Sequence, residues 1–288
     1  MIKIENTEVF GWEAAIRGMR NPMNSWERSD SSKEGCDRTP NCYMSKYYNI
    51  GKNDHNLMMR LANAGSVHAK YRRMITIYCD ITAPLYWWKE FDTYKVGTVA
   101  NSCSTMHKIH EKEFTLEDFS RENLMNDEAF AFPLGGGWRG LDAIEILKTT
   151  IEGLNTARKR YLDTKDKKYW WQMIQLLPSS YNQKRTVMLN YEVLANIFEY
   201  RKSHKLDEWI AFCQWIKNLP YSEIITGETS LPEIASEYMR KRINVPKESS
   251  YQTTCNKDKL PKKDDDVPIT GYVYDENIDK KEGGDNNE

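Results

Sequence analysis

Apolar residues repeat along the chain with two different periods, and each period predicts a different type of element. Between residues 70 and 81, in KYRRMITIYCDI, apolar and polar side chains divide between two faces of an extended segment. One face carries Ile75, Ile77, Cys79 and Ile81, and the other carries Met74, Thr76, Tyr78 and Asp80. Because the segment is rich in β-branched residues, we expect a strand there.

Helical spacing of apolar residues dominates most of the remaining chain. The segment 54–65 shows this spacing and ends on Gly65, a residue type that commonly terminates helices. Pro84 suits the first turn of an aromatic helix that contains LYWW. After a predicted turn at 135–140, GGGWRG, three further helices are expected at 141–162, at 186 to about 202, and at 206–219 before Pro220.

These elements predict an α+β chain, namely a helix-rich domain with a small central β-sheet. Residues 1–245 are expected to form one domain. Within it, residues 25–39 are rich in Ser, Asp, Lys and Gly, and we expect a mobile insertion there. Residues 246–288 are polar, charged and thin in apolar residues, which predicts a flexible tail.

Composition and charge narrow the class of protein. The 288 residues are enough to bury a core, and nine Trp and seventeen Tyr indicate an ordered interior. The net charge of −1 gives no overall attraction to nucleic acid or to an acidic membrane surface. No apolar run is long enough for a membrane span or a signal peptide. We therefore expect a cytoplasmic protein that binds neither nucleic acid nor membranes.

The familiar catalytic and metal-binding motifs are absent from the sequence. Six Cys occur without a CxxC pair or paired His at ligand spacing, so we expect reduced thiols and no metal. GxGxxG, the P-loop, GxSxG and HExxH are also missing. Cys103 has no identifiable base, and His68 after Gly65 suits a capping or core role. The hydroxyl-rich segment with Ser102 and Ser104 is either a solvated loop or the floor of a pocket for a polar ligand.

The helix that follows Asn190 has an unusual face. At about 100° per residue, Asn190, Leu194, Ile197 and Arg201 project in one direction, so a guanidinium points toward the interior or a pocket. A buried Arg needs a partner, which is either an acid such as Asp80 or Glu90 or an anionic or carbonyl-bearing ligand. Asn196 lies roughly 120° away and is expected to face solvent.

At residues 65–226 the chain resembles the flavin-dependent thymidylate synthase family, in a divergent branch. The segment SVHAKYRRMITIYCDITAPLYWW is similar to the family's succession of histidine, strand and Pro-started aromatic helix. The segment LLPSSYNQKRTVMLNYEVLANIFEYRKSHKLDEW resembles its C-terminal core. The resemblance implies a cytoplasmic homotetramer that binds FAD between subunits. It also implies reduction by NADPH and transfer of a one-carbon unit from methylenetetrahydrofolate to dUMP.

The resemblance also implies roles for individual residues. FAD would be bound by the residues at four matching positions, namely His68, Lys89, Asn190 and Asn196. Arg201 would face the pyrimidine, and a cation there favours the negative charge that activates the ring. The substrate phosphate would be held by Ser102 and Ser104.

Three departures from the family pattern affect the phosphate and flavin sites. The signature Arg-His-Arg is replaced by Lys89-Glu90-Phe91, and Ser104 comes about five residues later than the signature spacing. At two further positions where the family has arginine, this chain has Met106 and Ile174. Compensating cations would be Lys95, Lys184 or Arg185. Two alternatives therefore stay open: the same fold and flavin acting on another pyrimidine nucleotide, or a non-catalytic binding module.

Overall fold

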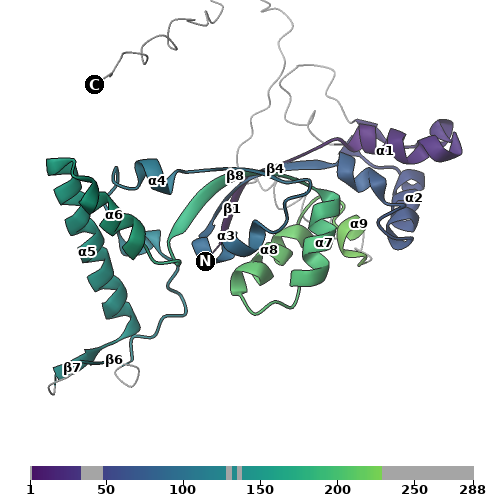
Figure 1. Cartoon of the computed structure of the whole chain (residues 1–288). Coiled ribbons are helices and arrows are strands. Elements are labelled where there is room, and N and C mark those ends of the chain that lie inside the picture. The colour runs from purple at the N-terminus through teal and green to yellow at the C-terminus, as the bar shows by residue number, and fades with distance from the viewer. Residues whose placement is uncertain (1, 34–47, 128–131, 135–137, 229–288) are drawn as a thin grey trace, which may run out of the picture. The chain divides into compact units, whose positions relative to one another are not determined.

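The computed structural model describes residues 2–33, 48–127, 132–134 and 138–228. It contains a four-stranded antiparallel sheet with the strand order β1-β4-β8-β5 (Figure 1). The strands are β1 (Lys3–Phe10), β4 (Thr76–Pro84), β8 (Asn182–Asn190) and β5 (Val99–Ser102). β4 and β8 pair along their whole length. The predicted helix-rich α+β fold with a small sheet is confirmed.

Strand β4 has the two faces that its sequence predicts. Ile77, Cys79 and Ile81 are buried on one side, which we call the inner face, whereas Tyr78 is exposed on the outer face. The strand begins at Thr76 because the preceding residues, Lys70–Met74, form a 3-10 helix instead. The alternation is therefore confirmed over the strand itself.

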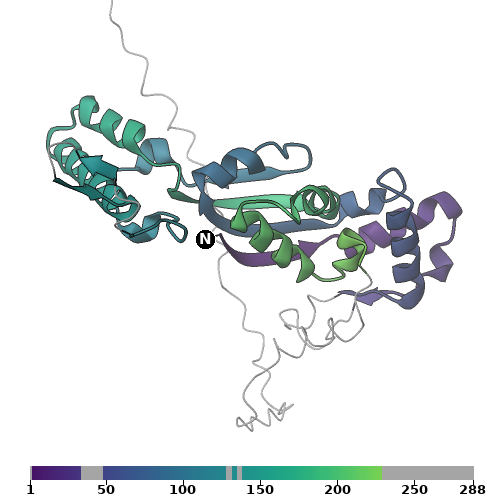
Figure 2. The same cartoon turned by 90° about the horizontal axis from the view of Figure 1, so that it is seen from below.

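Helices cover the inner face and share one apolar core with it. Seen from below, α7 and α8 lie in front of the strands (Figure 2). The helices of this core are α1 (Trp12–Arg20), α2 (Lys52–Asn63), α3 (Leu85–Phe91), α7 (Tyr191–Arg201), α8 (Asp207–Lys217) and α9 (Glu223–Thr226). The predicted end of α2 at Gly65 is confirmed, since α2 ends at Asn63 and Gly65, just beyond it, has a φ of +99°.

A second, smaller apolar cluster gathers around α5 (Ala143–Thr164) and α6 (Lys167–Leu176). The predicted helix at 141–162 is thus confirmed within two residues, and Asp142 caps its start. The remaining elements are α4 (Thr105–Lys108), the strand pair β2 (Ser32–Lys33) and β3 (Tyr48–Asn49), the pair β6 (Phe132–Leu134) and β7 (Trp138–Leu141), and 3-10 helices at Asn21–Met23, Trp26–Arg28 and Leu116–Asp118.

Two predicted elements are wrong in part. The helix expected from residue 186 begins at Tyr191, because residues 186–190 belong to β8, which pairs with β4 on one side and β5 on the other. A stretch of five residues is too short for its period to distinguish strand from helix. The turn expected at 135–140 is strand β7 from Trp138 onward, whereas Gly135 to Gly137 lie outside the described residues.

The described part of the segment 25–39 is held by a buried carboxylate. Asp54 lies 2.6 Å from Arg20 Nε and accepts hydrogen bonds from the hydroxyls of Ser29 and Ser31 at 2.7 and 2.6 Å. Burial raises the pKa of Asp54, but the hydrogen bonds from Ser31, Ser29 and Arg20 outweigh burial and lower the pKa overall. Residues 34–39 lie outside the described residues.

All described residues fall in one compact unit. The predicted tail at 246–288 lies outside the described residues. Among the helices of the described part, none combines the length and the apolar character that a membrane span requires.

Asp80 on the outer face makes the stability depend on pH. Hydrogen bonds from Thr186, Asn6 and Lys184 lower its pKa from 3.8 to about 2. Because this pKa lies below the unfolded value, the carboxylate stabilises the fold above about pH 4, and the contribution is lost as the pH falls toward 2. In thermal melts followed by circular dichroism, Asp80→Asn should melt below the wild type at neutral pH, and the difference should shrink below about pH 4.

The exposed Asp163 on α5 supplies the matched control. Asp163→Asn should melt with the wild type across the same pH range. A deficit of Asp80→Asn that is constant with pH would contradict the proposed origin of the low pKa.

Candidate functional site

Helix α3 is held against the inner face by its aromatic side chains. Trp87, Trp88 and Phe91 are at most 2% exposed, and their rings contact one another. Trp88 Nε1 also donates a hydrogen bond to the carbonyl of Gln183 at 3.0 Å, which fixes the rotation of the helix against β8. Because these three residues point inward, the polar residues among 89–92 are held on the accessible sides of α3.

Arg201 at the end of α7 has an acidic partner in the chain. Its Nη1 lies 2.6 Å from Oε2 of Glu90, and its Nε donates to the hydroxyl of Tyr94 at 2.9 Å. Trp209 Nε1 donates to the same Glu90 oxygen at 2.8 Å, and the guanidinium lies over the Trp209 ring, 4.7 Å from its centroid. His204 Nε2 is 2.9 Å from Arg201 Nη1. The protein partner anticipated for Arg201 is therefore Glu90.

A second ion pair lies on the other side of α3. Arg185 Nη1 is 2.7 Å from Asp92 Oδ1, and the guanidinium carbon lies 4.1 Å from the centroid of a Trp88 ring. Arg185 Nε also donates to Gln183 Oε1 at 3.0 Å. Ser102 on β5 stands opposite Arg185 in the sheet register, so the two side chains share the inner face. Both arginines near α3 are thus paired with carboxylates of the segment 89–92.

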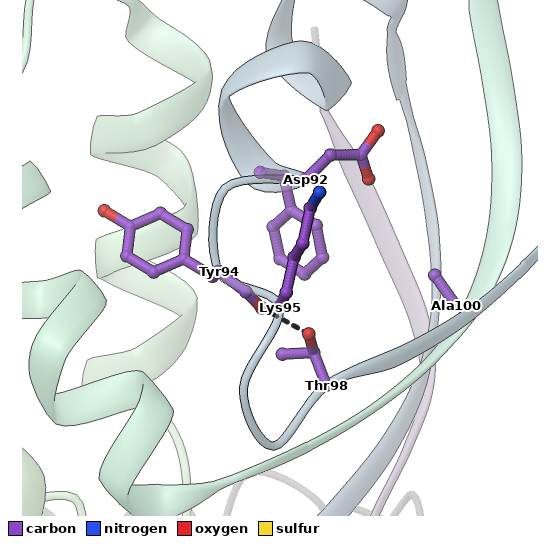
Figure 3. A pocket seen from close by; sticks show the side chains of 6 residues that line it. Asp92, Tyr94, Lys95, Thr98 and Ala100 are labelled. Carbon is purple, nitrogen blue, oxygen red and sulfur yellow. Dashed lines mark hydrogen bonds between the residues drawn. The ribbon is translucent and has the colours of Figure 1, made fainter.

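A pocket of about 360 Å³ opens between the end of α3 and β5 (Figure 3). It is lined by Phe91, Asp92, Tyr94, Lys95, Thr98 and Ala100. The Thr98 hydroxyl donates to the Tyr94 carbonyl and so closes the loop (Figure 3). The Tyr94 hydroxyl points away from Lys95 and Thr98, and it accepts a hydrogen bond from Arg201. Lys95 has no ion-pair partner in the described part of the chain. Of the hydroxyl-rich segment, Thr98 and Ala100 line this pocket, whereas Ser102 and Ser104 are not among its lining residues. A role of this segment as the floor of a ligand pocket therefore stays a prediction.

Asn190 joins this loop to α7. It is the N-cap of α7, and its Oδ1 accepts a hydrogen bond from the Val193 amide at 3.0 Å. A Cβ added to Gly97, which has a φ of +78°, would come within 2.8 Å of the Asn190 side-chain nitrogen. Only glycine permits this close approach. The two amide hydrogens of Asn190 have no acceptor among the described residues.

Three of the residues predicted to bind FAD are exposed. His68 lies on a turn ahead of β4, Lys89 lies on α3, and Asn196 lies on α7. Within the described ranges, none of the three side chains makes a hydrogen bond or ion pair. The expectation that Asn196 faces solvent is confirmed. These side chains are therefore free to bind a cofactor, and the lysine adds a positive charge suited to a diphosphate.

The remaining predicted residues divide between two faces. Ser104 caps α4, since its hydroxyl accepts from the His107 amide at 3.0 Å. Lys184 lies on the outer face and pairs with Asp80 at 3.1 Å, a hydrogen bond that raises the lysine pKa. Of the three cations considered as compensation, Lys95 lines the pocket and Arg185 pairs with Asp92, which lines it, whereas Lys184 lies on the opposite face of the sheet.

Several residues of the site escaped the sequence analysis. Tyr94, Asp92, His204 and Trp209 all contact one of the two arginines. Tyr94, Asp92 and Trp209 reach the arginines from other elements, so their contacts arise only from tertiary packing. His204 lies three residues after Arg201, a spacing that the sequence does show. No group of three or more His, Cys, Asp or Glu suited to a metal occurs among the described residues.

No protein-family model matches the chain, and no curated protein matches it either. Solved structures do share its fold. The flavin-dependent thymidylate synthase ThyX from Helicobacter pylori, complexed with FAD and dUMP, superposes with a TM-score of 0.52 at 15% identity, over 77% of this chain and 96% of that one. A second structure of thymidylate synthase X from this organism, also with FAD and dUMP, superposes with a TM-score of 0.52 at 15% identity. This match covers 82% of this chain and 99% of that one. The fold that the sequence resemblance implied is thereby confirmed.

The capping role of Asn190 can be measured separately from any role toward a ligand. Asn190→Ala removes the acceptor for the Val193 amide and should lower the free energy of unfolding by about 1 kcal/mol in urea titrations. Asn190→Asp keeps an acceptor and should stay close to the wild-type value. Equal stability of all three proteins would show that the cap contributes nothing.

Proposed function

We propose that this chain is a flavin-dependent, thymidylate synthase-like methyltransferase that transfers a one-carbon unit to a pyrimidine nucleotide. The substrate implied by the resemblance is dUMP, methylated to dTMP with methylenetetrahydrofolate as donor and NADPH as reductant. One observation supports the proposal above all. The chain shares its fold with a thymidylate synthase complexed with FAD and dUMP. In this fold Asn190 caps α7, and α7 carries Asn196 and Arg201. Arg201 contacts α3 through its ion pair with Glu90.

The residues predicted to bind FAD have suitable chemistry, but within this chain they do not form one cluster, because His68 precedes β4 and Lys89 follows its end. Lys89 offers a cation for the diphosphate, and the unpaired amide hydrogens of Asn190 offer donors. His68 and Asn196 add exposed groups that donate and accept hydrogen bonds. The flavin, when bound, would supply the hydride that completes the transfer. The chain's own residues bind and orient the reactants.

The pocket beside β5 suits the nucleotide phosphate. Lys95 is unpaired among the described residues, and Arg185 shares the inner face with Ser102. Charge-assisted hydrogen bonds of this kind are among the stronger contacts available to a phosphate. Ser104 would add a hydroxyl at the end of the same segment. Arg201 is the proposed catalytic residue, polarising the pyrimidine so that negative charge can develop on the ring.

A different pyrimidine nucleotide is favoured by one feature of the site. Glu90 places a carboxylate 2.6 Å from Arg201 and so opposes the field that the arginine would exert on a uracil ring. A different base would leave the fold and the proposed flavin site as they are. The second candidate function is therefore the same chemistry on another base.

The first experiment is an absorbance spectrum of the purified protein from about 300 to 550 nm, before and after addition of FAD and then dUMP. We expect a bound-flavin spectrum that shifts with the nucleotide. Asn196→Ala and Asn190→Asp should each weaken FAD binding by about tenfold, which corresponds to the loss of one hydrogen bond of about 1.4 kcal/mol.

The exposed Asn218 at the end of α8 provides a matched control, and Asn218→Ala should bind FAD like the wild type. Failure to bind flavin at any FAD concentration would refute the proposed flavin-dependent activity and favour the alternative of a non-catalytic binding module.

We further propose a cytoplasmic homotetramer with FAD between subunits. Support comes from the outer face of the sheet, where Phe10, Tyr78 and Val99 are 52%, 45% and 60% exposed. Exposed apolar side chains that gather on one face commonly mark a contact with another chain. Light scattering coupled to gel filtration should give four times the mass of the chain, and Tyr78→Asp should reduce that mass. A monomeric wild type would contradict the assembly.

A further inference from the structure

Glu90 and Arg201 present an acceptor and a donor next to each other. Glu90 Oε2 is occupied by Arg201 Nη1 and Trp209 Nε1, but Oε1 has no partner in the described part of the chain. Likewise, Arg201 uses Nε and Nη1 to contact Tyr94 and Glu90, while Nη2 has no partner among the described residues. The Glu90 side chain is 35% exposed. The Arg201 side chain is 17% exposed, so two adjacent, partly exposed side chains each keep one free polar atom.

The carboxylate is held firmly in this position. Its helix is fixed by buried aromatic rings, and Oε2 receives hydrogen bonds from two directions. His204 Nε2 lies 3.5 Å from the same oxygen. Rotation of Glu90 away from a ligand would break the contacts to both Arg201 and Trp209. Any base that binds here must accept the carboxylate as part of the site.

Resting on the nucleotide site of the proposed function, we propose that Glu90 makes this site select cytosine nucleotides over uracil nucleotides. The 4-amino group of cytosine donates to Glu90 Oε1, while its N3 accepts from Arg201 Nη2. In the same orientation uracil turns its O4 toward the carboxylate and its N3–H toward the guanidinium. Acceptor then faces acceptor and donor faces donor, and each group loses its hydrogen bond.

Uracil can satisfy both groups only by moving one position along its edge. That shift places N3–H at Glu90 and a carbonyl oxygen at Arg201, but it moves C5 away from the place that C5 of cytosine occupies. The proposal therefore concerns both the affinity for the base and the position of the ring.

The test measures the dissociation constants of dCMP and dUMP by calorimetry on the full chain with FAD present. Wild type should bind dCMP at least about tenfold more tightly than dUMP. Glu90→Gln keeps an oxygen for Arg201 and Trp209 but turns the free edge into an amide donor. This variant should lower the dUMP-to-dCMP ratio of dissociation constants by at least about tenfold and bring the two nucleotides to parity or reverse their order.

Glu199→Gln is the matched control, because Glu199 lies on α7 in an exposed pair with Lys202. It should leave the ratio unchanged. Wild type that binds dUMP as tightly as dCMP would overturn the selectivity, as would an unchanged ratio in Glu90→Gln. If Glu90→Gln fails to fold, the wild-type ratio decides alone.

The same samples separate this inference from the proposed function. Flavin binding is read from the absorbance spectrum, independently of the nucleotide titrations. Flavin bound without dCMP preference overturns the inference and leaves the flavin enzyme standing. Preference for dCMP without flavin supports the inference and refutes the flavin chemistry. Failure of both nucleotides to bind overturns both.

Discussion

Trp87 and Trp88 lie fully inside the core on the inner face of the sheet, and their burial determines what the rest of α3 can present. Removing a buried tryptophan typically costs about 3–5 kcal/mol, so the helix cannot rotate to relieve strain at its surface. The Trp88 indole hydrogen bond to β8 fixes the helix further. Glu90 and Asp92 therefore have set positions, and each reaches an arginine of a different element.

The two ion pairs differ in how strongly they oppose an incoming anion. Asp92 is half exposed, and pairs of this kind contribute about 0–1 kcal/mol, so a phosphate can replace Asp92 at Arg185 with little loss. The pair of Arg201 with Glu90 is more covered and has the Trp209 indole as a third member. A ligand at Arg201 thus meets a pair that stays intact, and it is recognised by the free atoms of both residues.

The chain shares its fold with a thymidylate synthase at 15% identity, and the fold alone does not set the charges of the site. The order of strand, aromatic helix, strand and α7 is enough to place Asn190, Asn196 and Arg201 on one helix. The charges around them are set by single residues on α3. At these positions Lys89 is exposed and Glu90 is paired with Arg201, whereas Phe91 is buried.

The sequence by itself determined the alternation of β4, the start and end of α5 within two residues, and the inward direction of Arg201. These follow from local period, because neighbours along an element share a face regardless of the rest of the chain. It did not determine that residues 186–190 form a strand between two others, or that Glu90 rather than Asp80 pairs with Arg201. Those outcomes depend on contacts between residues 85 or more positions apart, and only tertiary packing brings such residues together.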